Sequence, residues 1–216
     1  ELIRCKRKSV LLRVNADATL TVRAPWWMPK FSVVQFVTSK ANWVAQKQAE
    51  FITHSAPTKT YAGGETFYCA GEPFTLERTA IKKTYFDSGV LHIPTTSTHP
   101  QKLLDHWYRV QATELFEARL LLWYKHMKPV LGVREFKQLS IRKMATRWGS
   151  CRTNGNVTLN LKLMAYPKEC LDYVIVHELS HLKEMNDSPR FYALMAEFMP
   201  EWKQHKTRLQ DKKFEW

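Results

Sequence analysis

Three residues near the C-terminal end of the chain have types and spacing suited to metal-dependent hydrolysis. His177, Glu178 and His181 form an H-E-x-x-H pattern, and the apolar residues around them recur at helical spacing. On a helix, histidines four positions apart project from one face, where both imidazoles can bind one zinc ion. Glu178 can then take a proton from a water on that ion. The alternative, polar residues paired inside the core, requires costly burial of three such groups. We therefore predict zinc ligands at His177 and His181 and a catalytic Glu178.

The third ligand has two candidates, because a catalytic zinc normally takes three protein ligands and keeps a fourth position for water. Glu184 lies on the same helix face as His177, but a rigid helix carries it a full turn beyond His181. Asp187 follows Asn186, which we expect to end the helix in a left-handed conformation, so that the chain folds back. We favour Asp187.

The composition is typical of a globular protein with a substantial core. The chain has 216 residues, 44% of them hydrophobic, which is enough for one large domain or two small ones. No stretch approaches the roughly 18 consecutive apolar residues of a membrane span, and the first residues do not form a signal peptide. The four cysteines are far apart and form no C-x-x-C pair, which is typical of free thiols in a reducing compartment. We expect a cytoplasmic protein without membrane association.

The chain is strongly basic, with a net charge of +13. Residues 1–60 hold ten Lys or Arg against three Asp or Glu, so the excess is partly concentrated there. A nucleic-acid partner would explain this charge, and so would a solvated basic surface. We favour the second explanation because no compact basic and aromatic RNA-binding signature and no DNA-reading motif is present.

The first part of the chain is predicted to be mainly antiparallel β structure with one helix. Alternating residues predict a hairpin of strands 9–14 and 19–24, with its turn at 15–17. A helix with one apolar face is predicted from the N-cap Ser32 to residue 51, and the neighbouring Trp43 is expected to pack. Four more strands are expected at 66–68, 74–76, 82–86 and 90–93.

The second part is predicted to be helical with a short antiparallel sheet. A Thr, Ser and Pro-rich connector at 94–100 marks the boundary, giving domains 1–96 and 97–216. We expect a long helix at 101–128, a strand near 157–161 and, after the H-E-x-x-H helix, another helix with Ser188 as N-cap and Pro189 in its first position. An extended substrate could add along the free edge of the strand at 157–161. The fold class is α+β.

Several segments of this part resemble one known family. They are R-W-G-S-C at 147–151, G-N-V-T-L-N-L at 155–161, the stretch 172–182 and S-P-R-F-Y at 188–192. They resemble the YgjP-like metallopeptidase-domain family, which is related to SprT-like and other H-E-x-x-H peptidases. The resemblance implies a zincin-like second part that binds zinc through His177 and His181, with Glu178 as general base. It also implies that Asp187 stands where the family usually has His, and this exchange alters the metal site.

Two hypotheses for function follow. The first is a zinc-dependent metallopeptidase acting on a peptide or protein substrate, in which Arg147 or Tyr192 assists a developing oxyanion. The alternative is a basic nucleic-acid-associated protein with a structural or vestigial zinc site, favoured by the charge and by the altered third ligand. Nothing in the sequence indicates a particular oligomeric state.

Overall fold

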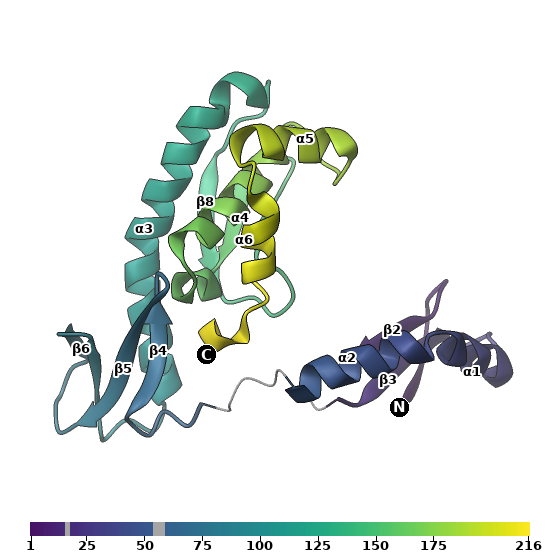
Figure 1. The fold of residues 1–216 in the computed structure, drawn as a ribbon, viewed down its shortest axis with the longest axis horizontal. Helices are drawn as coiled ribbons and strands as arrows, with labels where there is room; N and C mark the ends of the chain where they lie inside the picture. Colours follow the sequence, from purple (N-terminus) through teal and green to yellow (C-terminus); the bar gives the residue numbers. More distant parts are fainter. Residues whose placement is uncertain (16–17, 54–58) are drawn as a thin grey trace. The chain divides into compact units, whose positions relative to one another are not determined.

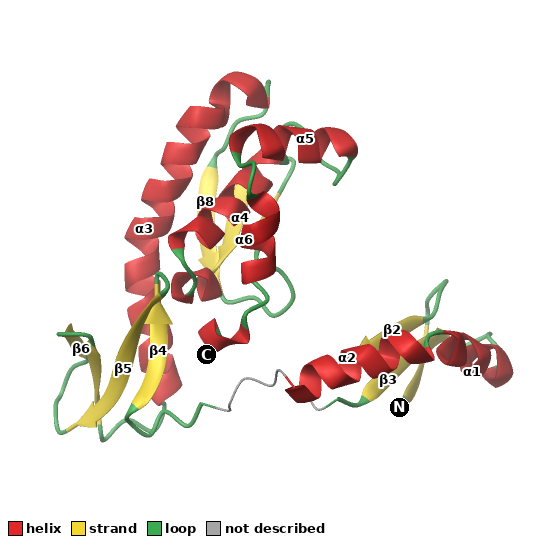
Figure 2. Cartoon of the chain, viewed as in Figure 1, coloured by secondary structure: helices red, strands yellow, loops and turns green. Residues whose placement is uncertain are grey.

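The computed structural model of the chain describes residues 1–15, 18–53 and 59–216 (Figure 1). It divides into two compact units, Glu1–Pro57 and Thr58–Trp216. Both units combine helices with short sheets (Figure 2), which confirms the α+β class. Among the described residues, no helix is both long enough and apolar enough to cross a lipid bilayer.

The first unit is a three-stranded sheet with two helices. Its elements are β1 (Leu2–Cys5), β2 (Leu11–Val14), β3 (Leu20–Pro25), α1 (Lys30–Ser39) and α2 (Ala41–Thr53). The predicted hairpin is confirmed, since β2 pairs antiparallel with β3. Its turn includes residues 16–17, which lie outside the described residues. β1 was not predicted, and it pairs parallel with β3, so the sheet is mixed.

The structure divides the helix predicted for residues 32–51 into two. α1 begins at Lys30 after Pro29, so Ser32 is not its N-cap. At the end of α1, the Ser39 hydroxyl donates a hydrogen bond of 2.7 Å to the Phe36 carbonyl. Such a side-chain bond to the preceding turn competes with the helical backbone bonds. Lys40 then leaves the helix, and α2 starts at the next residue.

The second unit is organised along one long helix, α3 (Pro100–Leu131), and contains two sheets. The four-stranded sheet has the order β4-β5-β7-β6, and the three-stranded sheet has the order β8-β10-β9. Each includes one parallel pair, β5 with β7 and β8 with β10, so both sheets are mixed rather than purely antiparallel. The remaining elements are β4 (Glu65–Cys69), β5 (Glu72–Thr79), β6 (Tyr85–Asp87), β7 (Val90–Pro94), β8 (Gln138–Arg142), β9 (Gly149–Cys151), β10 (Asn156–Asn160), α4 (Lys168–Ser180), α5 (Pro189–Phe198), α6 (Trp202–Arg208) and the 3-10 helices η1 (Leu161–Ala165) and η2 (Lys212–Phe214).

α3 joins both sheets into a single hydrophobic core. Near its start, the buried Tyr108 hydroxyl donates to the Tyr68 carbonyl of β4 over 2.6 Å. Farther along α3, the Arg119 guanidinium forms two hydrogen bonds with the Asp172 carboxylate of α4. The predicted division at residue 96 therefore falls inside the second unit, because β4–β7 bury their apolar side chains in the same core as α3. The structure divides near residue 57 instead.

Candidate active site

The H-E-x-x-H residues lie at the end of α4, a helix enclosed by protein. α4 begins after Pro167, whose fixed backbone angle suits a helix start. Contacts with α3, α5, α6, β9, β10 and η1 surround it, and most of its residues are buried.

The helix ends at Ser180, with His181 as its C-cap, five residues before the predicted end. Asn186 is not among the residues with a positive φ angle, so the left-handed stop predicted there is wrong. The Glu184 amide instead closes the turn by donating to the Ser180 carbonyl over 2.9 Å.

Three side chains that could bind one metal ion converge beyond the end of α4. One ligand atom from each of His177, His181 and Asp187 lies within 4.8 Å of the other two. Among the residues that the structure describes, these three form the candidate metal-binding group. The structure therefore brings together the three residues that the sequence analysis selected as ligands, and the Glu184 carboxylate is not a member of the group.

Glu184 has a different part in the site, through its backbone. The Glu184 carbonyl lies 3.0 Å from Nδ1 of His181. A carbonyl oxygen only accepts hydrogen bonds, so Nδ1 carries a proton, and in the neutral imidazole Nε2 then has the free lone pair. That Nε2 atom lies 3.6 Å from Oδ1 of Asp187. Orienting a metal-binding imidazole through its other ring nitrogen is common in metal sites, so the donor set fits a metal ion.

His177 is also suited to metal binding, because it is kept neutral. Burial and, to a smaller extent, the nearby His181 lower its pKa to about 4, although the charge of Asp187 acts in the opposite direction. Its Nδ1 atom is buried without a hydrogen-bond partner among the described residues. A neutral imidazole is the form that binds a metal.

Phe191 of α5 fixes the orientation of both imidazoles. Its fully buried ring stacks on His181 at 4.5 Å between centroids and meets the edge of His177 at 4.9 Å. Phe191 is held by the predicted start of α5, which is confirmed: Ser188 is the N-cap, its hydroxyl accepts from the Phe191 amide over 3.3 Å, and Pro189 follows in the first turn. The sequence analysis did not find this role for Phe191.

The Glu178 carboxyl packs directly against the backbone of β9. A Cβ atom added at Gly149 would lie 2.5 Å from Oε1 of Glu178, so a side chain at this position has no space. Glu178 is 4% exposed. Burial and, to a smaller extent, the charge of Asp187 raise its pKa to about 8, although Arg147 acts in the opposite direction. The carboxyl thus lies in a protected position between β9 and the candidate ligands.

β9 forms the edge of the sheet beside Glu178, and this corrects the strand predicted to accept a substrate. β10 lies between β8 and β9, so it has no free edge. The Arg152 amide donates to the Asn156 carbonyl, and the Trp148 carbonyl accepts from the Asn160 amide. Because backbone groups alternate in direction along an antiparallel strand, those of Gly149 and Cys151 point away from β10.

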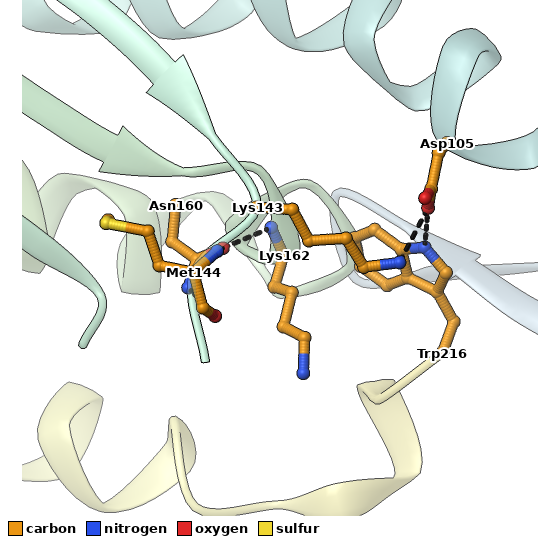
Figure 3. A network of polar contacts seen from close by, with 6 residues as sticks. All are labelled: Asp105, Lys143, Met144, Asn160, Lys162 and Trp216. Atoms are coloured by element: carbon orange, nitrogen blue, oxygen red, sulfur yellow. Dashed lines mark hydrogen bonds and ion pairs between the residues drawn. The ribbon is translucent and has the colours of Figure 1, made fainter. Parts of the chain in front are cut away.

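The loop before β9, residues 143–148, carries Arg147. Asn160 and Asp105 hold this loop from two sides (Figure 3). The Asn160 amide, 2% exposed, donates to the carbonyls of Met144 and Arg147 and accepts from the Met144 amide. On the other side, Asp105 accepts hydrogen bonds from Lys143 (2.7 Å) and from the Trp216 indole (2.8 Å). Arg147 is exposed, and its positive charge lowers the pKa of Glu178.

Tyr192, the other residue considered for an oxyanion, has its ring engaged elsewhere. It stacks on Trp202 of α6 with 5.1 Å between centroids, and it meets the Phe191 ring edge-on. The structure thus gives Tyr192 a packing role between α5 and α6.

Known proteins provide a family match and a structural likeness. The family described as "YgjP-like, metallopeptidase domain" matches residues 8–212. Among solved structures, the chain is similar to the crystal structure of the metallopeptidase zymogen of Pyrococcus abyssi abylysin, with 24% sequence identity, a TM-score of 0.38, and coverage of 45% of this chain and 93% of that chain. No curated protein matches. The family match includes every residue of the candidate site.

Proposed function

Since the chain belongs to the YgjP-like metallopeptidase-domain family, we propose that it hydrolyses peptide bonds with a zinc ion held by His177, His181 and Asp187 and with Glu178 as general base. The observation that supports this proposal is the convergence of three ligand atoms within 4.8 Å at the end of the helix that carries Glu178. When bound, zinc lowers the pKa of its water to about 7 and polarises a carbonyl oxygen.

The residues of the chain then divide the proton transfers between them. Glu178 takes a proton from the attacking water and passes it to the leaving amine. A carboxyl with a raised pKa holds that proton more readily than an ordinary glutamate, which suits both steps. Gly149 gives the carboxyl its space, and the Glu184 carbonyl and the Phe191 ring hold the two imidazoles in place.

We place the substrate along the outer edge of β9. An extended peptide can pair there with the backbone groups of Gly149 and Cys151, as peptides add to exposed sheet edges in other proteins. This position brings the peptide next to Glu178. Two residues were considered for stabilising the oxyanion, and we favour Arg147. Its positive charge is close enough to Glu178 to lower the pKa of that carboxyl, whereas the Tyr192 ring packs on Trp202.

The test is a Glu178→Gln variant of the full chain, assayed for zinc content and for hydrolysis of casein and of a mixture of quenched-fluorescent peptides. We expect about one zinc per chain, as in the wild type, and a loss of turnover of at least about 1,000-fold, because only the proton acceptor is removed. Glu184→Gln is the matched control, since it keeps the backbone carbonyl that binds His181, and it should hydrolyse normally. Wild-type turnover by Glu178→Gln would refute the assignment of the base.

A further inference from the structure

The first unit, Glu1–Pro57, leaves a group of aromatic side chains exposed to solvent. Trp26, Trp27 and Phe31 are 71%, 56% and 76% exposed, and Phe36 and Trp43 are 37% and 41% exposed. The prediction that Trp43 packs is therefore wrong for this unit taken by itself. Single exposed apolar residues are ordinary, but a concentration of them in a small unit indicates an interaction surface.

Trp26 and Trp27 are presented on a braced turn. The Arg4 guanidinium donates to the carbonyls on either side of this pair, to Pro25 over 2.8 Å and to Met28 over 2.7 Å. The Met28 amide also donates to the Pro25 carbonyl over 3.2 Å. The two indoles are therefore attached to a backbone whose shape is fixed before any partner arrives, which lowers the entropic cost of binding.

Phe36 and Trp43 line a groove of about 270 Å³ on the same unit. Lys40 lies between them in the sequence, and Val10 to Leu12, at the edge strand β2, complete the lining. Pockets that enclose drug-sized ligands measure roughly 300–1,000 Å³, so this groove is sized for a single ring system. A cation beside two aromatic rings suits a flat ring attached to an anionic group.

Besides the exposed aromatic rings, the first unit carries the positive charge that an anionic partner requires. Residues 1–57 contain nine Lys or Arg and three Asp or Glu, whereas residues 58–216 contain 24 and 17, so the positive charge is denser in the first unit. Eight of its nine cations are exposed: Arg4, Lys6, Arg7, Lys8, Arg13, Arg23, Lys30 and Lys40.

We propose that the first unit binds single-stranded nucleic acid, with bases stacked on Trp26, Trp27 and Trp43 and with the exposed cations on the phosphates. Proteins that bind single strands without sequence preference combine a basic surface with aromatic stacking platforms in this way. In a duplex the bases stack on one another, so their faces are not accessible to aromatic side chains; we therefore propose a single strand. A membrane would suit one convex apolar tip, whereas these rings come from a turn and two helices and include a concave groove.

The test measures binding of the full chain to a fluorescein-labelled 25-nucleotide oligo(dT) by fluorescence anisotropy. We expect binding that weakens about 20- to 50-fold between 50 and 200 mM salt, which corresponds to three or four phosphate contacts. The double variant Trp26→Ala/Trp27→Ala should bind at least about 10-fold more weakly, because stacking of each base on an aromatic ring accounts for roughly 5- to 150-fold in affinity. Trp26→Phe/Trp27→Phe should stay within about threefold of the wild type.

The matched control is Tyr85→Ala/Phe86→Ala, which removes another adjacent pair of exposed aromatics, from β6 in the second unit. It should bind like the wild type. The proposal is overturned if the wild type does not bind the oligonucleotide, if it binds a 25-base-pair duplex as tightly, or if polyglutamate competes equally well. It is also overturned if the tryptophan variant binds oligo(dT) normally and loses only binding to vesicles containing phosphatidylserine.

Discussion

Replacing Gly149 by Ala tests whether β9 and Glu178 form one working unit. The new Cβ would lie 2.5 Å from Oε1, 2.7 Å from Cγ and 2.8 Å from Cδ of Glu178, whereas ordinary contact begins at 3.4 Å. The carboxyl would therefore have to move by about 0.9 Å. Gly149 does not have a positive φ angle, so Ala introduces no backbone strain of its own. A displacement of about 1 Å costs roughly 100-fold in rate, or about 2.7 kcal/mol of transition-state stabilisation.

The assay compares kcat for peptide hydrolysis, zinc content and the thermal midpoint in three proteins: the wild type, Gly149→Ala and Ser150→Ala. Ser150 is the next residue of β9, and its side chain points to the opposite face of the sheet. We expect Gly149→Ala to keep its zinc and lose about 100-fold in kcat, while Ser150→Ala keeps both. Normal turnover by a folded Gly149→Ala protein would refute the proposed position of Glu178. Loss of zinc together with activity would also refute it, because the new side chain would then have displaced the metal ligands rather than the Glu178 carboxyl.

Three further predictions concern the framework of the second unit. Asp172→Ala should lower the free energy of unfolding by about 2–3 kcal/mol in urea, because it leaves Arg119 without its bidentate partner; wild-type stability would show the pair to be dispensable. Asn160→Ala should cost about 2–4 kcal/mol and reduce turnover while zinc is retained, since it releases the loop that carries Arg147; unchanged turnover would contradict a positioning role. Burial raises the pKa of Cys69 and Cys170 to about 11, so both thiols stay protonated at pH 8 and should react with a disulfide reagent much more slowly in the native than in the unfolded chain; equal rates would contradict it.

The sequence predicted which side chains lie together at the candidate site better than it predicted the local path of the chain. The H-E-x-x-H spacing selected His177 and His181, because helical geometry makes that spacing informative by itself. Asp187 was favoured through a left-handed stop at Asn186, yet the structure reaches the same group by ending the helix at Ser180. Asp187 thus lies beside the two histidines, as predicted, although the predicted left-handed stop at Asn186 is wrong. Its role as a metal ligand stays a prediction.

Features that depend on contacts between distant segments could not be read from the sequence. The closeness of Gly149 to Glu178 and the packing of Phe191 on both imidazoles are tertiary, although both residues lie in the segments that resemble the family. The predicted boundary at residue 96 followed a Thr, Ser and Pro-rich stretch. Composition marks a turn between β7 and α3 there, but it does not tell whether the elements on either side share a core.

The resemblance to the family implies that Asp187, the proposed third ligand, stands where the family usually has His. A carboxylate brings a negative charge to the site that an imidazole does not. That charge already raises the pKa of both Glu178 and His177. We therefore expect Asp187→His to bind zinc and to change the catalytic rate, while Asp187→Ala loses metal affinity.

The most direct measurement of the central claim is zinc affinity, obtained by competition with a chromophoric chelator for the metal-free wild type, Asp187→Ala, Asp187→His and Glu184→Ala. The proposed site predicts one zinc per chain in the wild type, at least about 10-fold weaker binding in Asp187→Ala, and affinities close to the wild type in the other two. Equal affinities in Asp187→Ala and the wild type, or weaker binding only in Glu184→Ala, would contradict the assignment of His177, His181 and Asp187 as the metal site.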